Sequence, residues 1–309
     1  MARRSRSSFG PLAAGGGGRA ALKALLVVLA LAGAGVGVVF GLARLGQALR
    51  DAPEYRISRE SLRLVSGPAW MTPAIRAELD VTSSLPTRFS VLDPTIPERV
   101  ARAYEACLWV ERVESVRVRD VRVAGPGAPG LEVRLTFRRP MAFVEVGGRD
   151  GYCLVDARGV RLPGTYREPR LGDVRLLVIT GCAEPPPAPG RVWSAPALEA
   201  AVRVAEAVEP RREKFGLASV DVSNFGGRRD PRQTEVTLWT VNQTEIKWGR
   251  APTPEAERLQ EKTLTEKVGY LDYVYESFQG RVDGVLSYID IPNEAVGRRS
   301  TPERYRLRS

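Results

Sequence analysis

The pattern of apolar and polar positions separates an N-terminal apolar run from a longer stretch of short, mixed elements. Lys23 and Arg44 bracket twenty residues, 24–43, that contain no charged and no strongly polar side chain. A helix rises about 1.5 Å per residue, so a helix of this length spans about 30 Å, the thickness of a bilayer's hydrocarbon core. The run therefore predicts one transmembrane helix.

The charges that flank this run predict its orientation. Residues 1–23 hold five basic side chains and no acid, whereas the residues after the run mix basic side chains with Asp51 and Glu54. Segments that stay in the cytoplasm carry an excess of Lys and Arg, so we expect a cytoplasmic N-terminus. A cleaved signal peptide is the alternative. Its apolar core has only about 7–15 residues and ends at a small-residue cleavage site, so an uncleaved signal anchor is favoured.

Periodicity after the run predicts a small unit over residues 56–141 with the order β-α-α-β-β. Alternating apolar and polar residues indicate its strands, and apolar residues spaced by three and four indicate its helices. Thr72 is the expected N-cap of the first helix, with Pro73 in the first turn. The predicted elements are a strand over 61–65, a short helix opened by Thr72, a helix over 95–107, and strands over 115–119 and 131–137.

Residues 142–297 predict a second unit, dominated by antiparallel strands, so that the fold class of the whole chain is α+β. Turns with Gly, Asn or Pro separate its short apolar runs. A helix over 195–208 is expected to have Ser194 as its cap, and a longer helix over 254–278 to be broken near Gly269. The predicted strands cover residues 143–146, 153–155, 174–179, 219–222, 235–241, 244–248 and 285–291.

Most of the excess of basic over acidic residues lies in the two tails of the chain. The formal net charge is +10, of which residues 1–23 carry +5 and residues 298–309 carry +4, so the residues between them are nearly neutral. Nucleic acid is therefore not a predicted partner. The predicted organisation is a disordered cytoplasmic tail over 1–23, a transmembrane anchor over 24–43, a connector over 44–55, folded units over 56–141 and 142–297, and a basic tail over 298–309.

The residue types present restrict the possible chemistry. The chain has no histidine, which excludes Ser-His-Asp triads, Cys-His pairs and His-ligated metal sites. We expect no catalytic residue, no metal, no cofactor and no small-molecule substrate. A carboxylate-based hydrolase is the alternative, with Asp156, Asp221 and Asp290 as its acids, although each lies beside a turn, where Asp usually caps main-chain groups.

The three cysteines leave two interpretations open. A Cys153–Cys182 disulfide could form outside the cytoplasm, but an odd number leaves one thiol unpaired. The spacing is too sparse for a disulfide scaffold, and three buried thiols, Cys107 included, are the favoured interpretation.

Several short motifs follow one another after the apolar run and resemble those of the FtsQ/DivIB family of cell-division proteins. Leu108 stands where that family usually has Pro, and Pro292 stands where it has Arg. The motifs are Leu64-Val-Ser-Gly67 with Ile75-Arg-Ala-Glu-Leu79, Leu108-Trp-Val110 before Val113-Glu-Ser-Val-Arg-Val118, Leu131-Glu-Val-Arg-Leu135 with Arg139-Pro-Met-Ala142, Leu154-Val-Asp-Ala-Arg-Gly159, Leu176 to Gly181, Glu245-Ile-Lys-Trp-Gly-Arg250 and Ser287-Tyr-Ile-Asp-Ile291.

The resemblance implies a signal anchor followed by a POTRA domain over 56–141 and a β-domain with two helices over 142–297. It implies a non-catalytic scaffold in the inner membrane, single-pass with a cytoplasmic N-terminus, at the division septum. Such a scaffold binds small bitopic coiled-coil division proteins outside the cytoplasm and helps control septal peptidoglycan synthesis. A POTRA-type component of outer-membrane assembly or secretion is the alternative.

The C-terminal end of the second unit is the predicted partner-binding region. Alternation would place Val285, Ser287, Ile289 and Ile291 on the core face and Tyr288 on the other. Pro292 is expected to end this strand, and residues 294–297 resemble the family's final edge strand. The predicted partner-binding residues are Val285, Tyr288, Ile289, Asp290, Ile291, Ala295 and Val296.

Three glycines predict a packing face on the transmembrane helix. Gly33, Gly37 and Gly41 repeat every four residues and therefore share one side of a helix. Small residues in this pattern let a second membrane helix approach closely. The alternative is that glycine is simply common in membrane spans.

The predicted topology can be tested with reporter fusions at the C-terminus. A reporter that is active only outside the cytoplasm, fused after Ser309, should give signal, because the basic flank holds the N-terminus inside. A cytoplasm-only reporter at the same position is the matched control and should stay silent. Signal from that control would contradict the topology.

Overall fold

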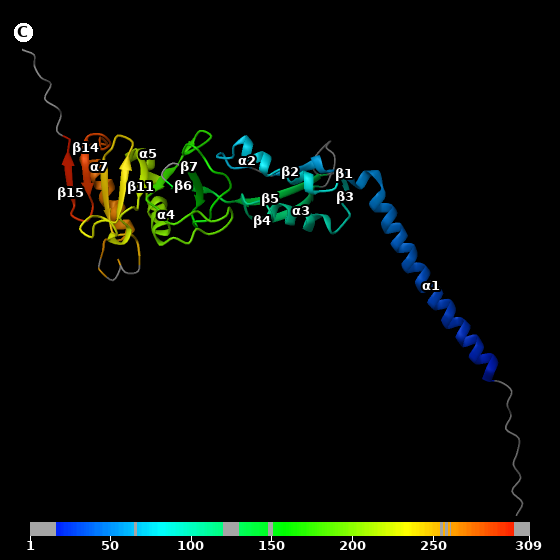
Figure 1. Ribbon diagram of the computed structural model, residues 1–309. Helices are drawn as coiled ribbons and strands as arrows, with labels where there is room; N and C mark the ends of the chain where they lie inside the picture. The colour runs from blue at the N-terminus through cyan, green and yellow to red at the C-terminus, as the bar shows by residue number, and fades with distance from the viewer. Residues whose placement is uncertain are drawn as a thin grey trace, which may run out of the picture. The chain divides into compact units, whose positions relative to one another are not determined.

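The computed structural model describes residues 17–64, 67–119, 130–147, 151–253, 256, 259 and 261–299. In these residues the fold is mixed α+β, with a long N-terminal helix, a large sheet and a few further helices (Figure 1). The chain divides into two compact units. One draws on Met1–Leu62, Pro86–Ile96 and Val118–Leu131, and the other on Arg63–Leu85, Pro97–Arg117 and Glu132–Ser309. The domain boundaries expected from the sequence stay predictions.

The N-terminal helix α1, Gly17–Asp51, contains the predicted transmembrane run. Its segment Leu25–Asp51 has a mean hydropathy of 2.6 and no buried share, so it is long and apolar enough to cross a membrane. Within the part of the chain that the structure describes, it is the one helix with these properties. The predicted packing glycines lie in α1, where open space surrounds the position of a Cβ at Gly33, Gly37 and Gly41.

The elements between residues 56 and 137 follow the predicted order, with additions. Two short strands that the sequence did not predict, β1 (Arg56–Ser58) and β3 (Arg88–Ser90), pair antiparallel. Thr72 caps its helix as predicted, since its Oγ1 accepts a hydrogen bond from the Ile75 amide at 3.3 Å. Residue 65, part of the first predicted strand, lies outside the described residues. The predicted elements are β2 (Leu62–Leu64), α2 (Pro73–Glu78), α3 (Ile96–Glu105), β4 (Val110–Arg119) and β5 (Gly130–Phe137).

Strands β2, β5 and β4 form a three-stranded sheet in that order. The assignment of this region as a POTRA domain stays a prediction. Among the described residues, five 3-10 turns, one further short helix and one more strand pair also lie outside the large sheet and its two covering helices. They are η1 (Pro53–Tyr55), η2 (Arg59–Ser61), η3 (Val81–Ser84), η4 (Glu209–Arg211), α5 (Arg212–Phe215) and the antiparallel pair β8 (Arg170–Leu171) and β9 (Val174–Arg175), with η5 (Phe225–Gly227) in a loop.

An eight-stranded mixed sheet dominates the second unit. Four of its strand pairs are antiparallel and three are parallel, so the expectation of a mainly antiparallel unit is corrected to a mixed sheet. Its strands, in spatial order, are β15 (Ala295–Arg298), β14 (Leu286–Asp290), β13 (Glu245–Gly249), β12 (Val236–Thr240), β11 (Leu217–Asp221), β10 (Leu177–Thr180), β6 (Pro140–Val146) and β7 (Gly151–Asp156).

Helical crossovers explain two of the three parallel pairs. Helix α4 (Pro196–Val208) lies between β10 and β11 in the chain, and α7 (Leu264–Ser277) lies between β13 and β14. Neighbouring parallel strands need a crossover connection, which is usually a helix. Both crossovers step in the same direction from strands that point the same way, and such connections are right-handed, so both helices lie on one face. Consistently, α4 and α7 contact one another and share one core with the sheet.

The predicted N-cap of α4 is wrong by one residue. Ala195 is the cap, in an extended conformation, and Pro196 occupies the first helical position. Ser194 lies one residue too early, and the N-terminus of α4 has no side-chain cap. Proline at the first position suffices to start the helix because its φ is already helical and its missing N–H is not needed there.

The helix predicted over 254–278 is shorter than expected and has no break at Gly269. It begins at Leu264, after a capping box in which the Thr263 side chain and the Glu266 side chain each bond the other's main-chain amide. Such a box satisfies two main-chain amides at the start of a helix. Gly269 sits inside α7, which buried neighbours such as Leu271 hold in place. Pro254 and Arg258, part of the predicted helix, lie outside the described residues.

All three cysteines are free thiols, so the Cys153–Cys182 disulfide does not form in this structure. Cys153 is buried in the core, as expected, but Cys107 and Cys182 are only partly buried. Burial, with the nearby Glu184 carboxylate, raises the pKa of Cys182 to about 11. The Cys182 thiol therefore stays protonated at neutral pH and is a weak nucleophile.

A buried ion pair fastens the segment after β13 to helix α7. The side chain of Lys267 is 2% exposed, and its Nζ lies 2.9 Å from Glu261 Oε1. The same Nζ donates to the Arg250 carbonyl at 3.2 Å and lies 5.6 Å from the centre of the Trp248 ring. Burial lowers the pKa of Lys267, and the Glu261 carboxylate opposes that shift.

We expect Glu261→Gln to destabilise the protein more than Lys267→Met does. Removing one partner of a buried pair leaves an uncompensated charge, which costs about 2 kcal/mol at this partly exposed carboxylate. Replacing the lysine by a similar apolar chain removes the charge itself. Thermal unfolding of the full chain should show a transition lowered by roughly 4–8 °C for Glu261→Gln. Glu276→Gln, on an exposed glutamate of α7, is the control, and equal effects of all three changes would contradict the pairing.

Candidate functional site

The two edge strands of the eight-stranded sheet differ in whether the main-chain groups on their outer sides are paired. At one edge, β7 is covered, because Tyr152 and Tyr166 exchange two main-chain hydrogen bonds of 2.8 Å and the Leu162 amide donates to the Leu154 carbonyl. At the other edge, β15 pairs with β14, and within the described chain no strand pairs with its outer side (Figure 1). The predicted final edge strand is therefore confirmed as β15, and its outer row of main-chain groups is open.

A β-bulge sets which side chains of β14 face the core. The register steps from the Leu286–Arg298 pair directly to the Tyr288–Gly297 pair, which leaves Ser287 as the extra residue. The expected alternation is therefore wrong at its start. Leu286 is fully buried, whereas Val285 is 45% exposed. After the bulge the expected pattern holds, with Ile289 and Ile291 in the core.

Tyr288 lies on the sheet face opposite the core, as predicted. Its ring packs over Gly297 of β15, where any Cβ would overlap the Tyr288 ring carbons. Lys247 Nζ, from β13, lies 5.1 Å from the centre of the same ring. An aromatic ring with a polar tip, half-buried beside an open edge, is typical of a protein interface.

The turn between β14 and β15 is held by hydrogen bonds from both sides. Asp290 Oδ1 accepts the Asn293 amide at 3.0 Å, so its carboxylate belongs to the turn. Lys262 Nζ donates to the Ile291 carbonyl at 3.0 Å and to Glu294 Oε1 at 2.7 Å. Strand β14 ends at Asp290, before Pro292, as the sequence predicted. These bonds fix the position at which β15 begins.

Two tyrosines of α7 lie near this turn and were missed at the level of sequence. The rings of Tyr270 and Tyr273 are 6.2 Å apart, and Tyr273 is 64% exposed. Lys262 Nζ lies 5.8 Å from the centre of the Tyr270 ring. Burial, followed by the Glu294 carboxylate, raises the pKa of Tyr270. The spacing of three within a predicted helix would have placed both rings on one face.

The predicted partner-binding residues fall into two groups. The side chains of Ile289 and Ile291 are fully buried, so they could meet a partner only after rearrangement of the core. The others are at least partly exposed and lie together on the β14–β15 hairpin, namely Val285, Tyr288, Asp290, Ala295 and Val296. Their role in partner binding stays a prediction.

The three carboxylates considered for a hydrolase each accept main-chain hydrogen bonds in a turn. Asp156 accepts the amides of Arg158 and Val160 at 2.9 Å, and Asp221 accepts the Ser223 amide at 2.7 Å. Asp156, Asp221 and Asp290 lie on β7, β11 and β14, which are not neighbours in the sheet. In the described residues no three Asp, Glu or Cys side chains gather into a metal-binding group.

No family model matches the chain, and no curated protein matches it either. The resemblance to the FtsQ/DivIB proteins accordingly rests on the short motifs of the sequence, and what it implies stays a prediction.

We expect Gly297→Ala to destabilise the β14–β15 hairpin, because a Cβ at residue 297 would overlap the Tyr288 ring. Overpacking of this kind costs about 1–3 kcal/mol. Gly269→Ala is the matched control, since its Cβ meets nothing within 4 Å and should stabilise α7 by about 0.5–1 kcal/mol. Thermal unfolding of the two variants should shift in opposite directions. A stabilising Gly297→Ala would contradict the packing described.

Proposed function

We propose that this chain is a membrane-anchored scaffold of the bacterial division machinery, without catalytic activity of its own. It binds small bitopic coiled-coil division proteins outside the cytoplasm and helps control septal peptidoglycan synthesis. The observation that carries the proposal is the open outer edge of β15, at the end of a sheet whose other edge is covered. The resemblance to the FtsQ/DivIB family supplies the kind of partner and its setting.

Binding at this edge would proceed by strand addition. An extended segment of the partner forms main-chain hydrogen bonds with β15, and its alternate side chains contact the two sheet faces. On the face away from the core it meets the Tyr288 ring, which packs over Gly297 of β15. Beyond the turn, Tyr273 offers a further exposed ring. An open strand edge invites aggregation unless something covers it, which supports a dedicated partner.

The anchor limits where such a partner is found. Helix α1 is long and apolar enough to span the inner membrane. With its basic N-terminal flank in the cytoplasm, the part of the chain after α1 lies on the outer side. A bitopic partner held in the same membrane is then confined to two dimensions near β15, which raises its effective concentration without any further contact.

Two variants test the proposed edge. Tyr288→Ala removes the ring that covers Gly297, and a chain that ends after Pro292 lacks β15 altogether. Truncation of an interface aromatic costs about 2 kcal/mol, roughly a thirtyfold loss of affinity. The measurement is a binding titration of the full chain, in lipid nanodiscs, with the small bitopic coiled-coil division proteins of the same cell.

The control is Tyr55→Ala, which removes an exposed tyrosine outside the large sheet and should leave the affinity unchanged. The thermal transition of Tyr288→Ala should persist, which separates loss of the partner from loss of the fold. Binding of both edge variants with wild-type affinity would show that the partner docks elsewhere.

A further inference from the structure

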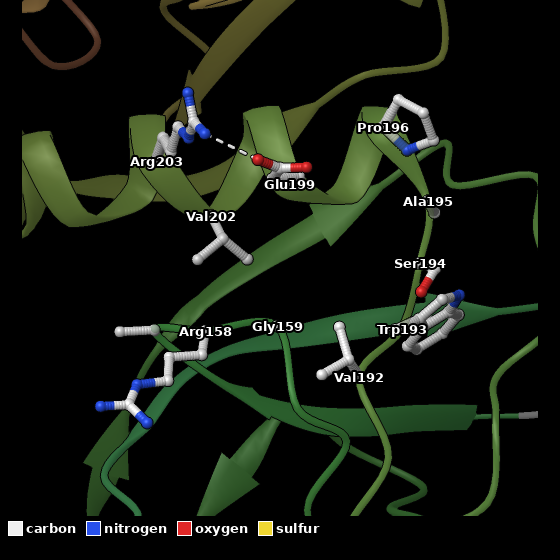
Figure 2. Close-up of a pocket in the computed structure, with 11 residues that line it drawn as sticks. Arg158, Gly159, Val192, Trp193, Ser194, Ala195, Pro196, Glu199, Val202 and Arg203 are labelled. Carbon is white, nitrogen blue, oxygen red and sulfur yellow. Dashed lines mark hydrogen bonds and ion pairs between the residues drawn. The ribbon is translucent and has the colours of Figure 1, made fainter.

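A cavity of about 460 Å³ lies beside β7, at the opposite end of the large sheet from β15. Its walls are the turn after β7 at residues 157–159, the extended segment 192–195, and the first half of α4 (Figure 2). Seven strand spacings of about 4.8 Å separate β7 from β15, so the cavity lies roughly 34 Å from β15. It is therefore separate from the candidate site described above.

The middle of the cavity is apolar. Figure 2 shows the side chain of Val202 pointing down from α4 toward the gap into which Val192 points from the other side. Val202 belongs to the core, whereas Val192 is 57% exposed. An exposed branched side chain at the mouth of a cavity is a ready contact for an aliphatic group of a ligand.

The rim of the cavity is cationic. Arg158 and Arg203 line it against a single acid, Glu199. Arg203 pairs with Glu199 at 2.7 Å, and Arg158 pairs with Glu111, outside the cavity lining, at 3.0 Å. Both arginines are more than half exposed, and exposed ion pairs of this kind contribute little. Arg203 Nη1 also donates to the Pro252 carbonyl at 3.3 Å. All these contacts are made by exposed arginine side chains, so either guanidinium group can exchange them for a ligand carboxylate placed between the two.

Main-chain geometry beside the cavity favours an extended ligand. Val192 lies opposite Val160 in an antiparallel bridge. The flanking hydrogen bonds run from the Arg161 amide to the Arg191 carbonyl and from the Trp193 amide to the Gly159 carbonyl, each at 2.9 Å. In this arrangement the N–H and C=O of Val192 point away from Val160. Among the described residues nothing pairs with them.

We infer that this cavity binds an extended segment of a second protein in which an acidic side chain neighbours an aliphatic one. The aliphatic side chain fills the space between Val192 and Val202, the carboxylate bonds Arg158 and Arg203, and the main chain pairs with Val192. The positive end of the α4 dipole, which Ala195 leaves without a side-chain cap, adds to the attraction for the acid. This inference does not depend on the division role, and it gives the sheet a second docking position far from the first.

The test uses the full chain in lipid nanodiscs and two labelled eight-residue peptides. One alternates valine with glutamate, and the other alternates valine with lysine. Fluorescence anisotropy should show saturable binding of the glutamate peptide alone. Arg158→Gln and Arg203→Gln should each weaken that binding about tenfold, the effect of one charge-assisted hydrogen bond. Val192→Glu should weaken it too, because it places an acid at the apolar mouth of the cavity.

Arg232→Gln, at an exposed arginine in another loop, is the matched control and should leave the affinity unchanged. Equal weakening by this control, or no saturable binding, would overturn the inference. Displacement by free N-acetylglutamate at the same concentration as by unlabelled peptide would indicate a small-molecule site instead. Loss of binding in Tyr288→Ala would place the peptide at β15. Each of these results would reject the proposal.

Discussion

An open β-sheet has two edge strands, each of which pairs with another strand of the sheet on one side only. The main-chain groups on the outer side of each edge strand need a different hydrogen-bond partner. Here one end meets the requirement within the chain, because residues 160–166 pair with β7 and residues 190–193 pair with them in turn. The opposite end does not, since β15 is the last strand of the described sheet. The asymmetry is a property of the topology, and it determines where a partner can add a strand without breaking existing hydrogen bonds.

The same topology decides which face of the sheet is core. Two helical crossovers of one hand, stepping in one direction, put α4 and α7 together, and the sheet residues beneath them share one buried core with both helices. The Lys267 ammonium enters this layer with two partners, the Glu261 carboxylate and the Arg250 carbonyl. With both helices on one face, Tyr288 and Lys247 occupy the other, next to the open edge. Fold and candidate site therefore follow from one arrangement of strands.

Much of this arrangement could be predicted from local pattern. The apolar run at α1, the Thr72 cap and the strands that flank Gly and Pro turns are encoded by neighbouring residues. Parallel pairing was missed because it depends on which strands meet after a helix, although a helix between two strands is itself a signal for it. The bulge at Ser287 shifts the buried pattern by one residue, which no alternation rule anticipates. The cavity beside β7 joins segments far apart in sequence, and its residues carry no motif.

The residues of β15 follow those of every other strand in the large sheet. A chain that folds as it is made adds this strand last, so β14 is the provisional edge for as long as β15 is absent. That interval is hazardous, because a neighbouring unfinished chain can take the vacant place. The turn between β14 and β15 is short, and Lys262, which precedes it in the chain, donates hydrogen bonds to it. Both features limit the time for which the edge of β14 is exposed. Hairpins close within about 1–10 μs, so the interval in which β14 is an open edge ends soon after β15 has been made.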